Sequence, residues 1–186
     1  VECFQFGVER GRRHGVRGLR PAFLNTLPRQ VVAAAVERTA TGWRGRFAAM
    51  ASPCEVLLEG VDGHMARHLS GLAQAEALRI EARYSRYRSD SLVAQWHASQ
   101  GQPVELDGES ARLLDIAERC HALSAGLFDI TSGVLRAAWR FDGSQQAPEP
   151  AQIAALLPRV GFDKLRWQPP WLSVPQGMEV DLGGLA

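Results

Sequence analysis

The sequence is poor in the residues that cross-link a fold or bind zinc. Its three cysteines, Cys3, Cys54 and Cys120, are odd in number and lack the spacing of metal ligands. This argues against a disulfide framework and against a zinc site. Long hydrophobic runs are missing too. The stretch Val31–Val36 is too short to span a membrane. It is also a poor secretory signal, because Arg29 and Arg38 enclose it far from the start of the chain.

Aromatic residues make up only 8% of the chain, and Lys164 is its single lysine. The remaining composition is that of a globular protein, with 46% hydrophobic and 22% charged residues in 186 positions. A chain of this length suits one domain with a substantial core.

Charge is unevenly distributed along the chain. Residues 1–46 contain nine arginines and three acidic residues, whereas the remainder is net acidic. One interpretation is a basic tail that contacts nucleic acid or a membrane. The scarcity of stacking aromatic residues in this segment weakens the nucleic-acid interpretation. We therefore predict that residues 1–46 form a basic, disordered extension, that the folded domain spans residues 47–186, and that nucleic acid is not a partner.

From Phe47 onward the pattern predicts alternating strands and helices. Two short strands, broken at Pro53, are expected between Phe47 and Leu58. Apolar residues then recur at helical spacing from Met65 to Tyr84. His64 and His68 have metal-ligand spacing on this helix, but no third ligand is evident, so we interpret them as surface residues.

Cap residues predict the next elements. Ser89 and Ser91 are the candidate caps of a short helix through Trp96, and Asp107 is expected to begin a longer helix. That longer helix is expected to end at Ala125-Gly126. A helix starting at Pro148–Pro150, a hairpin around Pro169-Pro170 and a strand from Met178 that enters a glycine turn complete the α+β pattern.

The segment Ser124–Thr131 carries the most informative chemistry. Asp129 lies between Phe128 and Ile130, where burial is costly unless the carboxylate has a partner. Either Asp129 belongs to a ligand site or it is a solvated residue at a strand edge. Tyr87 lies among arginines and also has two interpretations. Either its ring stacks on a flat ligand ring, or it belongs to an ordinary polar connection and its ring is anchored in the core.

Four motifs in order resemble the FAD:protein FMN transferases, or ApbE-type flavin transferases. They are Met50-Ala-Ser-Pro-Cys54, Ser85–Ser91, Ser124–Thr131 followed by Gly133 and Trp139, and Val180–Ala186. The resemblance covers about Phe47 to Ala186. It implies an ApbE-like α+β fold of which this chain carries the N-terminal part, with the C-terminal side missing.

The resemblance also implies a reaction and a set of site residues. Members of this family use Mg²⁺ to transfer FMN from FAD to a threonine hydroxyl of a target flavoprotein, with release of AMP. Subunits of membrane-associated redox complexes are among the implied acceptors. The residues implied to bind FAD are Met50, Tyr87, Leu127, Phe128, Asp129 and Asp181. The backbone carbonyl of Gly184 is the implied metal ligand, which suits a hard cation.

The sequence departs from the family pattern in two places. Val134 stands where the family often has proline, and the motif that continues beyond Ala186 with Lys-Gly is absent. None of the five histidines stands in the context of the family's histidine, so the catalytic residues are unknown. We therefore expect the chain by itself not to transfer FMN.

Two other functions are alternatives to FMN transfer: a non-catalytic flavin-binding remnant and an FAD-hydrolysing flavin-trafficking protein. The family usually works in the periplasm or cell envelope, yet no export signal is legible, so the localisation is unknown.

Overall fold

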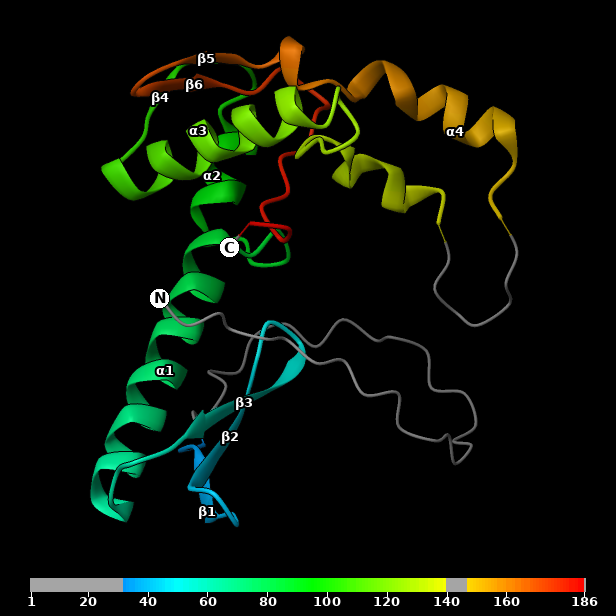
Figure 1. The fold of residues 1–186 in the computed structure, drawn as a ribbon. Coiled ribbons are helices and arrows are strands. Elements are labelled where there is room, and N and C mark those ends of the chain that lie inside the picture. Colours follow the sequence, from blue (N-terminus) through cyan, green and yellow to red (C-terminus); the bar gives the residue numbers. More distant parts are fainter. Residues whose placement is uncertain (1–31, 140–146, 186) are drawn as a thin grey trace. The chain divides into compact units, whose positions relative to one another are not determined.

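The computed structural model of the chain describes residues 32–139 and 147–185. The segment Ala33–Ala186 forms one compact unit. It combines two three-stranded antiparallel sheets with several helices (Figure 1). This arrangement confirms the predicted α+β class. What the sequence predicts for residues 1–31 lies outside the described residues.

The first sheet is a meander of β1 (Ala35–Arg38), β2 (Trp43–Ala49) and β3 (Ser52–Leu58). Its β2–β3 hairpin turns at Met50 and Ala51, which both have positive φ angles, of 52° and 57°. A two-residue turn of this kind matches the twist of the flanking strands. The chain therefore reverses before Pro53, which lies inside the edge strand β3 instead of breaking it.

The folded unit begins earlier than the predicted boundary at Phe47. Arg44 and Arg46 belong to β2, where they form ion pairs with Glu37 of β1 and Glu55 of β3. The Arg46 Nε–Glu55 Oε1 distance is 2.8 Å. Basic residues that resemble a tail in the sequence are thus cross-strand partners in a sheet, and the boundary at residue 46 is placed too late.

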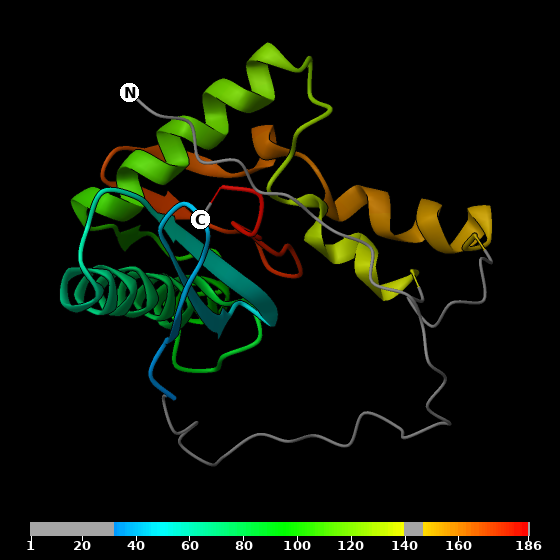
Figure 2. The ribbon, with the colours of Figure 1, turned by 60° about the horizontal axis from the view of Figure 1, so that its bottom comes forward.

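The helix α1 (Gly63–Tyr84) packs against this sheet (Figure 2). The Asp62 carboxylate caps it by accepting a hydrogen bond from the Met65 amide at 2.8 Å. Close contact is possible because small residues face each other: a Cβ at Gly45 of β2 would collide with the buried Ser70 side chain of α1. The predicted long helix is confirmed.

Two further helices begin at the predicted caps. Ser91 caps α2 (Leu92–Ala98) through the Ala94 amide at 3.1 Å. Asp107 caps α3 (Gly108–Leu123) through the amides of Glu109 and Ser110, both at 3.0 Å. Between the helices lies the short strand β4 (Val104–Glu105).

After α3 the chain forms short elements. These are the 3₁₀ helix η1 (Ser132–Ala137), α4 (Pro150–Leu156), η2 (Leu157–Arg159), η3 (Phe162–Lys164), β5 (Arg166–Gln168) and β6 (Trp171–Ser173). The predicted hairpin around Pro169-Pro170 is confirmed as β5–β6, which pairs with β4 in the second sheet.

The main core lies between the second sheet, α2, α3 and the C-terminal segment. Its fully buried side chains include Val93, Trp96, Leu114, Leu172 and Val180. Residues 178–182 contribute to this core but form no strand, so the strand predicted from Met178 is wrong.

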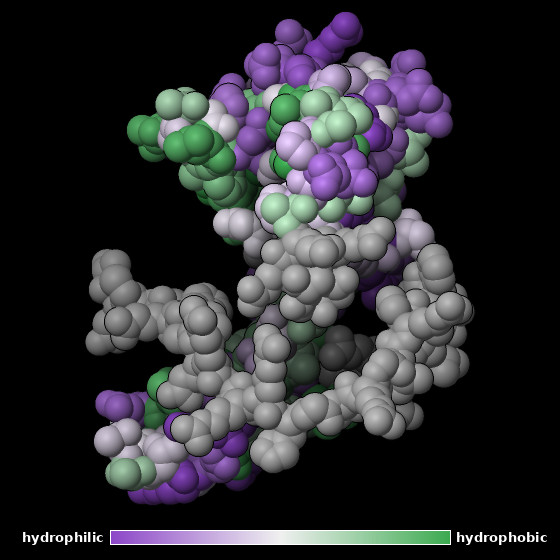
Figure 3. Space-filling view, turned by 90° about the vertical axis from the view of Figure 1, so that its right-hand side faces the viewer, coloured by the Kyte–Doolittle hydropathy of each residue, from purple (hydrophilic) through white to green (hydrophobic). Residues whose placement is uncertain are grey.

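None of the helices within residues 32–139 and 147–185 is both long and apolar enough to cross a membrane. The longest of those helices, α1, carries charged residues along its length. On the face shown in Figure 3, hydrophobic and hydrophilic side chains both reach the surface.

Candidate functional site

The segment Ser124–Thr131 forms a loop that leaves α3 through a left-handed turn. Ala125 and Gly126 have positive φ angles of 53° and 83°, and the Gly126 amide donates to the His121 carbonyl at 2.9 Å. This is the helix end predicted from the sequence. The Ser124 hydroxyl then accepts from the Phe128 amide at 2.8 Å, which fixes the start of the loop.

The Asp129 side chain is buried, and both of its carboxylate oxygens accept hydrogen bonds from the chain. Its Oδ1 accepts from the amide and the hydroxyl of Thr131, at 2.7 and 2.6 Å. Its Oδ2 accepts from the Phe162 amide at 2.9 Å. The side chain is only 8% exposed, which excludes the solvated strand edge. Both of its oxygens bond to the protein, so the carboxylate stabilises the conformation of the loop.

Thr131 extends this network to η3. Its hydroxyl is fully buried and accepts from the Gly161 amide at 2.7 Å. The ring of His121 stacks on Phe162 with centroids 5.5 Å apart, and its Nε2 lies 3.6 Å from Asp129 Oδ2. These contacts join the end of α3 to the turn before η3. Sequence reasoning missed Thr131 and Phe162 as partners of Asp129.

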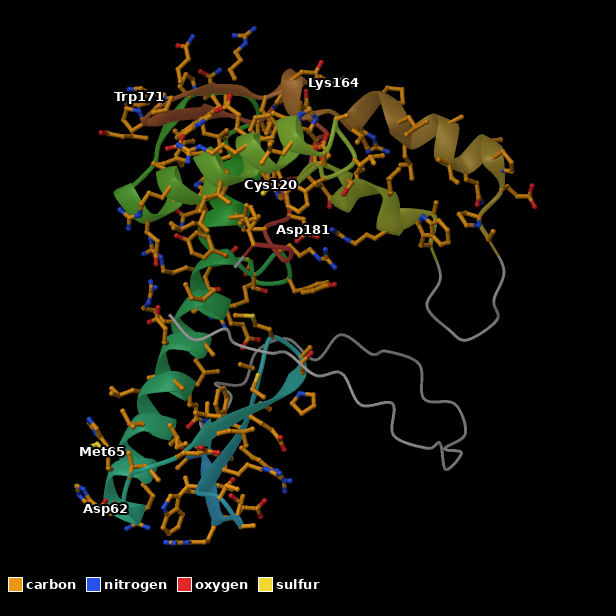
Figure 4. The ribbon with its side chains drawn as sticks, viewed as in Figure 1. Asp62, Met65, Cys120, Lys164, Trp171 and Asp181 are labelled. Carbon is orange, nitrogen blue, oxygen red and sulfur yellow. The ribbon has the colours of Figure 1, made fainter. Side chains whose placement is uncertain are left out.

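Asp181 has a more open environment than Asp129. Its carboxylate, labelled in Figure 4, forms an ion pair with Arg86 and accepts from the Gly183 amide at 3.0 Å. The Asp181 amide donates to the Ile130 carbonyl at 2.7 Å. A Cβ on Gly133 would lie 2.9 Å from the Asp181 Cβ, so glycine at position 133 lets the two segments approach.

Arg86 links Asp181 to Tyr87. Its guanidinium lies over the Tyr87 ring, 4.8 Å from the centroid, and its Nη2 donates to the Tyr87 hydroxyl at 2.6 Å. Within the part of the chain that the structure describes, Arg86 Nε is buried without a hydrogen-bond partner. Tyr87 is 70% exposed. An exposed ring beside a guanidinium suits a flat, anionic ligand.

The other predicted residues occupy different settings. Phe128 is half-buried, and a Cβ on Gly184 would lie 3.3 Å from its ring. Leu127 is 93% exposed. Met50 lies in the β2–β3 turn and is 43% exposed. Arg86 therefore links Tyr87 to Asp181, and Phe128 lies close to Gly184, whereas the Asp129 carboxylate bonds to its own loop and to Phe162.

The residues that the structure describes hold no cluster of side-chain metal ligands. Across residues 32–139 and 147–185, no three His, Cys, Asp or Glu side chains converge as metal ligands would. The Asp181 carboxylate is already engaged by Arg86 and the Gly183 amide. The Gly184 carbonyl would supply one oxygen ligand, and Mg²⁺ usually binds through one or two carboxylates together with substrate phosphates and retained waters. His64 and His68 are exposed on α1, as predicted.

Comparison with known proteins agrees with the resemblance seen in the motifs. The family model described as the ApbE family matches residues 50–186. The FAD:protein FMN transferase of Haemophilus influenzae is 29% identical over 92 residues, which are 46% of this chain and 26% of that protein.

Solved structures show the same fold. The ApbE protein from Thermotoga maritima is 23% identical, with a TM-score of 0.65 over 76% of this chain and 47% of its own. The flavinyl transferase ApbE from Pseudomonas stutzeri is 21% identical, with a TM-score of 0.58 over 82% of this chain and 47% of its own. The chain thus spans about half the length of these two structures. The motifs, the matched residues and the fold agree: the chain belongs to the ApbE family.

Proposed function

We propose that this chain forms the flavin-binding side of an FAD:protein FMN transferase. Membership of the ApbE family and the similarity to the Haemophilus influenzae transferase support this proposal. The observation that carries it is the cluster of Tyr87, Arg86 and Asp181, bounded by Gly133. In a site for a dinucleotide, an aromatic face stacks on the flat ring and a guanidinium binds the diphosphate. A glycine lets the ligand approach the backbone closely.

Each residue has a role that its surroundings support. The exposed Tyr87 ring offers a stacking surface, and Phe128 next to Gly184 offers a second apolar face. Arg86 neutralises phosphate charge with the N–H groups of its planar guanidinium. Asp181 accepts hydrogen bonds from ligand hydroxyl or ring N–H groups. Leu127 and Met50 are exposed apolar residues available to the flavin, and Asp129 holds the loop that carries Leu127 and Phe128.

The proposed reaction transfers FMN from FAD to a threonine hydroxyl of a target flavoprotein. The threonine oxygen attacks the phosphorus on the FMN side of the diphosphate, and a phosphoester forms. The bond between that phosphorus and the bridging oxygen breaks, and AMP leaves with that oxygen. The hydroxyl proton passes to a base whose identity is unknown. Dependence on Mg²⁺ and an acceptor such as a subunit of a membrane-associated redox complex belong to the same proposal, because the family resemblance implies them.

FAD titration tests the binding part of the proposal. The purified chain is titrated against FAD by flavin fluorescence, together with Tyr87→Leu and the matched control Trp171→Leu. Trp171 is an exposed aromatic residue of β6, 47% exposed. Loss of base stacking costs about 1–3 kcal/mol, so we expect Tyr87→Leu to weaken binding about tenfold and Trp171→Leu to leave it unchanged. Equal affinities for the two variants would remove Tyr87 from the site.

Product analysis tests the reaction. The chain is incubated with FAD, Mg²⁺ and a threonine-bearing flavoprotein, and an intact ApbE transferase serves as the positive control. AMP together with fluorescent acceptor in a denaturing gel would support transfer by the chain alone. AMP and FMN without labelled acceptor would identify a hydrolase. Bound FAD with neither product would identify a flavin-binding module.

A further inference from the structure

The segment Met178–Leu182 belongs to neither a sheet nor a helix, so other hydrogen bonds must hold its backbone in place. Met178, Val180 and Leu182 are buried in the main core, yet the segment has no regular secondary structure. Buried amides need hydrogen-bond partners, because an unpaired one costs about 1–3 kcal/mol. The partners of this segment therefore determine where Asp181 lies.

Two successive amides donate out of the segment to different elements. The Val180 amide donates to His97 Nε2 at the end of α2, at 2.8 Å. The Asp181 amide donates to the Ile130 carbonyl at 2.7 Å. The first bond joins residues 83 positions apart in the sequence. Together the two bonds hold the peptide that precedes the Asp181 side chain, and that side chain meets Arg86 and Gly133.

The bond to Val180 requires a neutral His97. Because Nε2 accepts from an N–H group, its lone pair is free and the ring proton lies on Nδ1. Burial lowers the pKa of His97 from its ordinary value of 6.5. Of the charged groups nearby, Glu179 raises this pKa and Arg136 lowers it, and these two residues pair with each other at 2.6 Å. The imidazole is therefore a neutral acceptor at neutral pH.

We propose that His97 is a positioning residue of the flavin site, which sets the place of the Asp181 carboxylate through its hydrogen bond to the Val180 amide. The proposal rests on the proposed flavin-binding function of the Tyr87–Arg86–Asp181 cluster. His97 itself does not contact that cluster by any described bond. His97 acts indirectly: it holds the Val180 amide, and a shift of that amide would move the side chain of the next residue, Asp181, relative to Arg86.

Hydrogen exchange tests the hydrogen bond without reference to FAD. Exchange is measured by mass spectrometry on the peptide containing residues 178–185 in the full chain. The variants are His97→Ala, His97→Gln and the control His68→Gln, since His68 is exposed on α1. Glutamine carries an oxygen acceptor at a similar reach and does not titrate. We expect faster exchange in His97→Ala and protection close to wild type in the other two.

FAD titration of the same variants tests the positioning role. We expect His97→Ala to weaken binding about tenfold, which is the effect of losing one buried hydrogen bond. His97→Gln is expected to remain within about threefold of wild type, and His68→Gln to be unchanged. Equal losses in the alanine and glutamine variants would overturn the proposal, because the hydrogen-bond acceptor would then be irrelevant.

A pH series separates positioning from simple support of the fold. A histidine whose pKa is lowered in the folded state stabilises that state fully at a pH above its unfolded-state pKa. This stabilisation is lost as the pH falls through the folded-state pKa. Because the His97 pKa is lowered from about 6.5, wild-type FAD affinity should fall only in the acidic range below that value, whereas the affinity of His97→Gln should stay level over the same range. Identical pH profiles would overturn the proposal.

The two proposals fail in different ways. A wild-type chain that does not bind FAD contradicts the proposed function, while the exchange experiment still tests the bond between His97 and Val180. A wild-type chain that binds FAD, with unchanged exchange and affinity in His97→Ala, contradicts the role of His97 alone. If His97→Ala does not fold, the exchange and pH profile of His97→Gln decide the question.

Discussion

Asp129 and Asp181 lie on two segments that a backbone hydrogen bond joins, yet their carboxylates differ in hydrogen-bond partners and in exposure. The Asp181 amide donates to the carbonyl of Ile130, the residue after Asp129. Asp129 is 8% exposed and accepts three hydrogen bonds from Thr131 and Phe162. Asp181 is 20% exposed, pairs with Arg86 and accepts one bond from the Gly183 amide. The first carboxylate supports the loop, and the second is more open to solvent.

The difference lies in the origin of the donors. Backbone amides and a buried hydroxyl are held by the fold itself, so a ligand displaces them only by unfolding the loop. A guanidinium on a flexible side chain exchanges partners more readily, because its bonds do not depend on a single backbone conformation. We therefore expect substitutions around Asp129 to act on stability and substitutions at Asp181 to act on binding.

The largest effect is expected for Asp129→Ala. Loss of the carboxylate leaves the Thr131 hydroxyl and two amides without their acceptor, and hydrogen bonds to charged groups contribute about 1.5–3 kcal/mol each. We expect a fall of about 3 kcal/mol or more in the free energy of unfolding, measured by urea denaturation, with FAD binding weakened as the loop loses order. The control is Asp90→Ala, since Asp90 is 68% exposed and pairs locally with Arg88. A change below about 1 kcal/mol for Asp129→Ala would contradict the structural role.

Thr131→Val gives the next largest effect. Valine has nearly the shape of threonine but leaves Asp129 Oδ1 without its hydroxyl donor and the Gly161 amide without an acceptor. We expect a loss of about 2 kcal/mol, measured as the shift in the urea midpoint at constant slope. Thr131→Ser keeps the hydroxyl and should lose about 1 kcal/mol, from the missing methyl group. Equal losses in the two variants would show that packing, and not the hydroxyl, matters here.

Asp181→Asn is expected to separate binding from stability. The Arg86–Asp181 pair is partly exposed, so its loss should lower the free energy of unfolding by about 1 kcal/mol or less. Removal of the charge should nevertheless weaken FAD binding about tenfold. Both quantities are measured on the same preparation, by urea denaturation and by flavin fluorescence. A large loss of stability with unchanged affinity would place Asp181 with Asp129 as a structural residue.

The smallest effect is expected at a third carboxylate, Glu109, which is 31% exposed between α1 and α3. Hydrogen bonds from Arg79 lower the pKa of Glu109 to about 2. A carboxylate with a lowered pKa stabilises the fold above its ordinary value, near 4.5, and loses this contribution as the pH falls toward 2. Water screens this pair, so Glu109→Gln should cost about 1 kcal/mol or less at pH 7.

Thermal unfolding at pH 7, 4 and 2 checks the Glu109 prediction. The difference between wild type and Glu109→Gln should shrink as the pH falls and be smallest at pH 2. A difference that stays constant with pH would mean that the charge of Glu109 contributes nothing to stability.

Local sequence signals were sufficient for the helices. Ser91 and Asp107 cap α2 and α3 as predicted, because a cap involves only residues two or three positions apart. The same applies to the end of α3 at Ala125-Gly126. The strand β2 was harder to predict, since Arg44 and Arg46 resemble a basic tail until Glu37 and Glu55 lie beside them.

The sequence by itself determined the caps of α2 and α3, the end of α3 and the family motifs, which single out Asp129 and Asp181. Only the tertiary structure decided what each carboxylate does. The donor that occupies Asp129 Oδ2 comes from Phe162, and the guanidinium that meets Asp181 comes from Arg86. The acceptor that holds Val180 comes from His97. Caps and helix ends are local interactions and leave a pattern in neighbouring residues. Partners distant in the sequence leave no such pattern, because folding alone brings them together.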